Sequence, residues 1–160
     1  MTKRIFRSIC LVALAVLIAC LVLILGFLYG YFNEVQHDQL KIQTDLAARG
    51  VSSQGLDYFE GLSTDDYRIT LIGADGNVLF DSKSDSSSME NHLEREEVQE
   101  ALETGYGESE RFSSTLLEKS LYSAERLPDG SVLRLSIIQN SVLTLILGML
   151  QPVCVIIVIA

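Results

Sequence analysis

Two long apolar segments enclose one polar block, and this arrangement limits what the chain can fold into. The first occupies residues 9–32, and the second occupies residues 141–160, where Gln151 and Pro152 interrupt it. A helix needs roughly 20 apolar residues to span a bilayer, because every backbone N–H and C=O must be paired within the segment. The sequence therefore predicts two transmembrane helices, the second truncated at the chain end, and we expect a larger membrane protein to continue from it.

Charge gives the two segments an orientation. Lys3, Arg4 and Arg7 precede the first segment and no acidic residue does, which is typical of a cytoplasmic flank. All 21 Asp and Glu lie in residues 33–140 with 9 of the 12 Lys and Arg, so this block has a formal charge of −12. We therefore expect residues 1–8 in the cytoplasm and the block outside the membrane. Its acidity argues against nucleic acid as a partner, because a phosphate backbone requires a basic surface.

A cleaved signal peptide is the alternative interpretation of the first segment. The apolar part of a signal peptide is about 7–15 residues long, and this segment is longer. Residues 17–20 resemble a lipoprotein cleavage site that ends in Cys20, but residues 21–32 remain apolar, where a processed lipoprotein becomes polar. We therefore favour an uncleaved anchor that stays in contact with membrane lipid.

The first segment is expected to continue as a helix beyond the membrane. Apolar residues recur at spacings of four and three up to about Arg49, and Gly50 is suited to end the helix. The positions of this heptad seam are Leu28, Phe32, Val35, Gln39, Ile42 and Leu46. One interpretation is an amphipathic helix that lies on its own domain. The other is a two-helix stalk in a homodimer, formed by the five apolar residues of the seam, and both can hold along different parts of the helix.

Alternation with a period of two follows in the polar block. The expected strands are residues 68–72, 78–80, 108–114, 121–126 and 132–138, with turns at 74–77 and 127–130. A helix is expected from Glu94 to Thr104, ended by Gly105, and its acidic side chains are expected to form a solvated face. This order predicts an α+β fold: a five-stranded antiparallel sheet with helices over it, as in PAS-like sensor domains.

Several short motifs are specific as a set because of their order and spacing. They occupy residues 68–82, 89–92, 95–98, 101–105, 107–115 and 129–134. Together they resemble the extracytoplasmic sensor region of PhoR-type histidine kinases, over about the whole of residues 1–160. The resemblance implies a homodimeric bacterial membrane protein of a two-component system, which detects an extracytoplasmic stimulus and transmits it through the second transmembrane helix.

The resemblance also implies parts that lie beyond this chain. These are a linker domain, a dimerisation helix with the phosphorylated His, and a kinase domain that uses ATP and Mg²⁺ and acts on a cytoplasmic response regulator. Neither His37 nor His92 lies in a context like that of the phosphorylated His. The alternative is a non-enzymatic receptor or adaptor ectodomain, chemoreceptor-like, on the same two-segment frame. Sequence beyond Ala160 separates the two classes.

No catalytic or metal-binding constellation is evident in the sequence. Cys10, Cys20 and Cys154 lie in the apolar segments, which leaves only His37 and His92 as soft ligands in the polar block, so a zinc site and disulfides are not expected there. No cofactor is expected in this chain.

A ligand pocket, if present, is expected between the sheet and residues 81–104. Its candidate residues are Asp81, Arg111, Ser113, Tyr122 and Arg134. The interpretation that we favour from sequence is that the arginines only pair with surrounding acids at the surface. Asp81 itself belongs, with Asp85 and Glu90, to a loop that reads as a solvated acidic surface.

Overall fold

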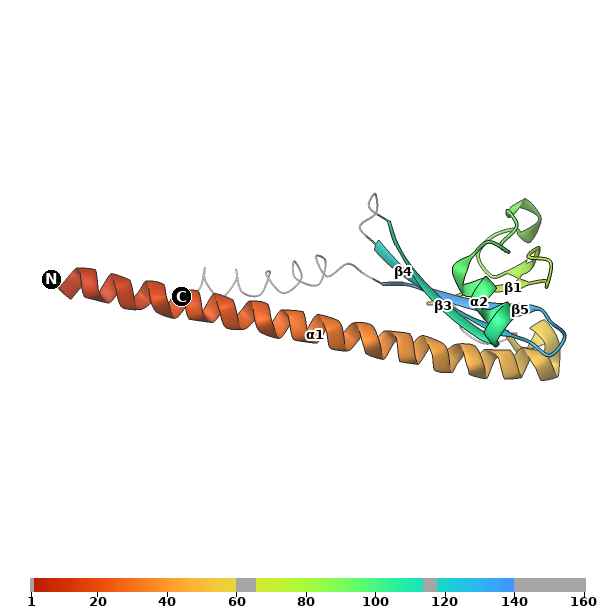
Figure 1. The fold of residues 1–160 in the computed structure, drawn as a ribbon, viewed down its shortest axis with the longest axis horizontal. Coiled ribbons are helices and arrows are strands. Elements are labelled where there is room, and N and C mark those ends of the chain that lie inside the picture. Colours follow the sequence, from red (N-terminus) through yellow and green to blue (C-terminus); the bar gives the residue numbers. More distant parts are fainter. Residues whose placement is uncertain (1, 60–65, 114–117, 140–160) are drawn as a thin grey trace. The chain divides into compact units, whose positions relative to one another are not determined.

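The computed structural model describes residues 2–59, 66–113 and 118–139 (Figure 1). Its helices and strands are α1 (Thr2–Gln54), β1 (Arg68–Ile72), β2 (Val78–Asp81), α2 (Glu96–Thr104), β3 (Tyr106–Ser113), β4 (Glu118–Arg126) and β5 (Val132–Gln139). Two short 3₁₀ helices, η1 (Gly55–Phe59) and η2 (Ser86–Ser88), complete the described elements. The second predicted membrane helix, at residues 141–160, lies outside the described residues.

The chain divides into two compact units, residues 1–36 and residues 37–160. The first unit is the N-terminal part of α1, and nearly all of its large apolar side chains are exposed. Among the described residues, this helix is long and apolar enough to cross a membrane, a test of length and composition that a signal sequence also meets. The helix predicted for residues 9–32 is therefore present, and it continues without a break past Cys20.

The second unit is built on one five-stranded sheet with the order β2-β1-β5-β4-β3. Every neighbouring pair is antiparallel, and β5 lies at the centre, between β1 and β4. The predicted α+β fold with a five-stranded antiparallel sheet is thus confirmed. The hairpin at residues 68–81 turns at Gly76, whose φ of 82° is a conformation that glycine adopts without strain. The fourth strand begins at Glu118, three residues before its predicted start at Leu121, because it pairs with β3 down to Ser113.

One face of the sheet is covered by the C-terminal part of α1. Apolar side chains of this helix pack against those of β1, β4 and β5, which point to this face on alternate residues. The buried cluster comprises Leu40, Ala47, Ala48, Val51, Ile69, Leu121, Leu127, Leu133 and Leu135. Counted from Leu40, the other buried positions of the helix follow after four residues (Thr44), seven (Ala47), eight (Ala48) and eleven (Val51). Such spacing places them on one side of the helix. The end of α1 therefore lies on its own domain, which is one of the two interpretations of this helix.

The predicted helix end at Gly50 is wrong. The helix continues through Gly50 to Gln54, and Gly55 follows it with a φ of 68°. A Cβ at Gly50 would lie 2.5 Å from the ring of Tyr58. Glycine is therefore required at residue 50 by the close approach of this ring to the helix, and Gly55 is the residue in the left-handed conformation that ends it.

The other face of the sheet is covered by α2 at one end only. Val98 and Ala101 of this helix pack against Ile72, Ala124 and Val132 in a second buried cluster. The helix begins two residues later than predicted, at Glu96, and ends as predicted at Gly105, which has a φ of 98°. A Cβ at Gly107 would clash with the carbonyl oxygen of Glu97, so this glycine lets β3 approach the helix closely. The remainder of this face is polar and open.

Candidate functional site

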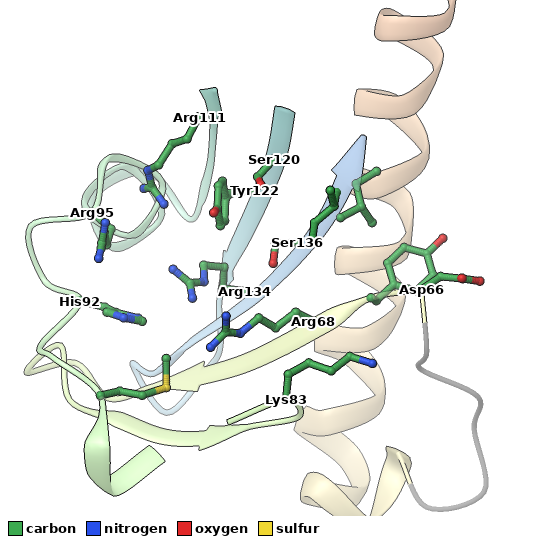
Figure 2. Close-up of a pocket in the computed structure, with 14 residues that line it drawn as sticks. Asp66, Arg68, Lys83, His92, Arg95, Arg111, Ser120, Tyr122, Arg134 and Ser136 are labelled. Atoms are coloured by element: carbon green, nitrogen blue, oxygen red, sulfur yellow. The ribbon is translucent and has the colours of Figure 1, made fainter. Parts of the chain in front are cut away.

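The open part of the α2 face is a pocket of about 660 Å³ (Figure 2). Its floor consists of side chains that point to this face from β1, β3, β4 and β5, and its rim comes from the segment between β2 and α2. The polar and charged residues that line it are Asp66, Tyr67, Arg68, Lys83, His92, Arg95, Arg111, Ser120, Tyr122, Arg134 and Ser136. This volume is in the range of pockets that hold small organic molecules.

A buried carboxylate lies at one edge of the pocket. The side chain of Glu97 on α2 is 0% exposed and accepts hydrogen bonds from three groups. Ser109 Oγ donates to its Oε2 at 2.6 Å, Arg111 Nη2 donates to the same oxygen, and Arg134 Nη1 donates to Oε1 at 3.2 Å. A buried charge is tolerated only when it is paired in this way. Glu97 therefore joins α2 to β3 and β5.

A second buried carboxylate, Asp81, extends the network to the β1–β2 hairpin. Arg134 Nη2 donates to Thr70 Oγ1 at 3.2 Å, and that hydroxyl donates to Asp81 Oδ2 at 2.8 Å. Arg68 Nε donates to the same carboxylate oxygen at 2.9 Å, and the backbone N–H groups of Lys83 and Ser84 donate to Oδ1. The polar network thus includes side chains of β1, β2, β3 and β5.

Tyr122 on β4 completes the floor. The guanidinium carbon of Arg111 lies 4.3 Å from the centre of its ring, and that of Arg134 lies 5.4 Å from it. Both distances are within the range of cation–π attraction. The ring therefore attracts both guanidinium groups and partly offsets the repulsion between them.

Both carboxylates stay ionised despite their burial. Burial alone raises the pKa of Glu97, but the Ser109 hydrogen bond and the charges of Arg111 and Arg134 outweigh it and lower the pKa below its usual value. The pKa of Asp81 is lowered in the same way, because the hydrogen bond from Arg68 and the backbone N–H donors outweigh the burial. Burial is also the main reason why the pKa of Arg134 is lowered.

His92, in the rim of the pocket, is buried and neutral. It is 5% exposed, and its Nδ1 has no hydrogen-bond partner among the described residues. Burial and the nearby charges of Arg134 and Arg95 lower its pKa to about 4. At neutral pH this imidazole therefore adds no charge to the pocket.

The structure brings three of the five candidate ligand-binding residues into the lining of the pocket, namely Arg111, Tyr122 and Arg134. Asp81 lies behind the lining as the partner of Arg68, and Ser113 is not among the lining residues. Two expectations about acids are wrong. Asp81 is buried and paired rather than part of a solvated acidic surface, and Glu97 is buried under α2 rather than on its solvated face.

Sequence reasoning missed Glu97, Arg68, Arg95 and His92. For Glu97 a signal was present, because it lies four residues before the buried Ala101 and next to the buried Val98, on the inner face of the helix. An acid at that position predicts a basic partner in the sheet. Arg95 and His92 come from a segment without periodicity, and no sequence pattern points them toward the pocket.

The arrangement consists of arginines and hydrogen-bonding side chains that can bind a ligand. Within residues 2–59, 66–113 and 118–139, no group of three or more His, Cys, Asp or Glu lies close enough to hold a metal ion. The sequence matches no protein-family model, and a search of curated proteins found no significant relative.

The buried His92 predicts a stability that falls with acidity. Because its pKa is lowered from 6.5 to about 4 in the folded state, the unfolded chain takes up the proton first, and stability decreases as the pH falls from about 6.5 to about 4. The expected loss is up to roughly 3 kcal/mol, measured by chemical denaturation of the full chain in a nonionic detergent. Protonation of Asp81 and Glu97, whose folded-state pKa values are lowered, adds a further loss below the usual carboxyl range.

A His92→Gln variant should flatten this dependence above about pH 4.5, where the carboxylates remain ionised. Ser120→Ala changes the same pocket without removing a titratable group, so it is the control and should leave the dependence unchanged. Equal pH profiles for the wild type and His92→Gln would contradict the neutral, buried state of this imidazole.

Proposed function

We propose that this chain is the input portion of a membrane sensor histidine kinase of the PhoR type, with a PAS-like sensor domain outside the membrane. The observation that carries the proposal is the strand order β2-β1-β5-β4-β3, with α2 between β2 and β3 in the chain and α1 before the sheet. Five antiparallel strands with helices over the sheet are the arrangement expected of a PAS-like sensor domain. The proposal is also supported by the candidate membrane span in α1 and by the basic residues Lys3, Arg4 and Arg7 before it.

The path of β5 suggests how a stimulus could be transmitted. This strand is central in the sheet, carries Arg134 into the pocket, and ends at Gln139, directly before the expected second transmembrane helix. A change at the pocket that favours one position of β5 over another would bias that helix between two states. The size of the bias equals the difference in affinity of the stimulus for those states.

The proposal includes a homodimer joined along α1. Ile42 and Leu46 of the seam are 59% and 56% exposed, whereas the stripe from Leu40 to Val51 is buried against the sheet. These two sets lie on opposite sides of the helix, so α1 has one apolar side for its own domain and another that its own domain leaves uncovered. A second copy of α1 is the partner that the heptad spacing favours.

Single cysteines on α1 test this dimer. Ile42→Cys should form a disulfide crosslink with its copy in membranes under mild oxidation, because the two residues would face each other across the seam. Lys41→Cys is the matched control, since Lys41 is exposed but lies on another side of the helix and should crosslink poorly. Equal crosslinking at the two positions would exclude the seam as the dimer contact.

Phosphorylation tests the kinase assignment. Membrane vesicles that contain the full-length protein encoded by the gene should form a phosphohistidine when given ATP and Mg²⁺, and His37→Gln should leave it unchanged because His37 is not the expected acceptor. A protein without phosphohistidine, in vesicles where the Ile42→Cys crosslink shows assembly, would contradict the kinase. That result would favour the receptor or adaptor class.

A further inference from the structure

We propose that the pocket binds a small polyanion, a molecule with two or more carboxylate or phosphate groups. The step beyond the proposed function is the chemical class of the ligand. Its basis is the juxtaposition of five cationic side chains with one carboxylate in the lining of a single pocket on an acidic domain.

The concentration of positive charge is the first argument. The cations that line the pocket are Arg68, Lys83, Arg95, Arg111 and Arg134, which are five of the nine in residues 33–140. Among the described residues, Asp66 is the only carboxylate of the lining, and together with the buried Asp81 and Glu97 it gives three carboxylates against four arginines. Like charges held together in a cleft repel each other and attract a counter-charge, because low-dielectric walls focus the field.

Unused hydrogen-bonding capacity is the second argument. Arg134 is 4% exposed, and its Nε has no partner among the described residues although Nη1 and Nη2 bind Glu97 and Thr70. A buried N–H without an acceptor is unfavourable, and an oxygen of a bound anion would remove this penalty. Figure 2 shows Arg68, Arg134 and His92 turned toward one another across the pocket.

Preorganisation is the third argument. Arg68 is held by Asp81, and Arg111 by Glu97, so these guanidinium groups need no rearrangement to meet an anion. Each has further N–H groups in the planar fork that suits carboxylate and phosphate oxygens. Arg95 forms no ion pair among the residues that the structure describes, and it reaches the pocket from the rim. Fixed floor cations and a rim cation together favour a ligand with more than one anionic group.

The size of the pocket limits the ligand to a small molecule. A volume of about 660 Å³ accommodates a compact organic anion but not a helix or a strand of nucleic acid. The effect of the bound ligand on signalling rests on the proposed function, because the ligand would act on β5 through Arg134. Binding itself can be measured without any kinase activity.

Calorimetry of the full chain in a nonionic detergent tests the inference, with citrate and pyrophosphate as probes at constant ionic strength and glycerol as the neutral blank. At least one probe should bind saturably with one molecule per chain. Binding of citrate alone would identify a polycarboxylate site, and binding of pyrophosphate alone a phosphate site. If neither citrate nor pyrophosphate gives a saturable heat of binding, the proposal is overturned.

Matched charge variants test the location. Arg95→Gln and Arg111→Gln should each weaken binding about tenfold or more, because each removes a charged hydrogen-bond donor from the pocket. Arg49→Gln removes the same charge from exposed α1, outside the pocket, and should change affinity less than about twofold. Arg111→Gln also leaves Glu97 with one arginine fewer, so Arg95→Gln keeps the test valid if that variant misfolds.

An equal effect of Arg49→Gln and Arg95→Gln would show that only the overall charge matters, and would overturn the site. The outcome is separable from that of the kinase test. Binding without phosphohistidine would retain the pocket and reject the kinase, whereas phosphohistidine without binding would do the reverse.

Discussion

The pairing of one buried carboxylate, Glu97, with Arg111 and Arg134 determines how this domain is organised. An unpaired charge at this depth would be strongly unfavourable, so α2 must lie where its carboxylate meets both arginines. The position of α2 in turn closes one end of the sheet with Val98 and Ala101 and leaves the other end open. Through Thr70 and Asp81, the same network extends to the β1–β2 hairpin.

The two faces of the sheet divide stability and binding between them. The α1 face is apolar, and burial of its leucines provides a stabilisation that does not depend on charge. Because that face holds the strands together, the opposite face can carry arginines at positions that a uniformly apolar core would not tolerate. β5 shows the division along one strand, where Leu133 and Leu135 point to the core and Arg134 and Ser136 line the pocket.

Local patterns in the sequence predict the framework well. Alternating residues and glycines with positive φ are properties of neighbouring residues. They determine the hairpin at residues 68–81, the turn that includes Gly130 and the helix end at Gly105. The prediction that Gly50 ends the helix is wrong, because the role of Gly50 depends on Tyr58, a residue that reaches it only through the turn after α1. Spacing can therefore locate a glycine but cannot always distinguish a helix end from a close packing contact.

The pocket was only partly predictable for the same reason. The sequence predicts Arg111 and Arg134 in two strands, whereas the strand pairing and the position of α2 decide that they share a face and which acids they meet. Acidic residues on a short helix are usually solvated, and Glu97 departs from this rule because it pairs with Arg111 on β3 and Arg134 on β5, 14 and 37 residues away. The position of Glu97 on the inner face of α2 indicates a basic partner, but a single sequence does not identify the strands that supply it.

A double-mutant cycle on Glu97 and Arg134 measures the central interaction most directly. The free energies of unfolding of Glu97→Gln, Arg134→Met and the double variant give the coupling energy of the pair, and Asp45 with Arg49, an exposed pair on α1, is the reference. The buried pair should couple by about 2 kcal/mol or more, and the exposed pair by about 0.5 kcal/mol or less. A coupling energy for Glu97 and Arg134 as small as that of the exposed pair would contradict the account, because α2 would then be held by its apolar contacts alone.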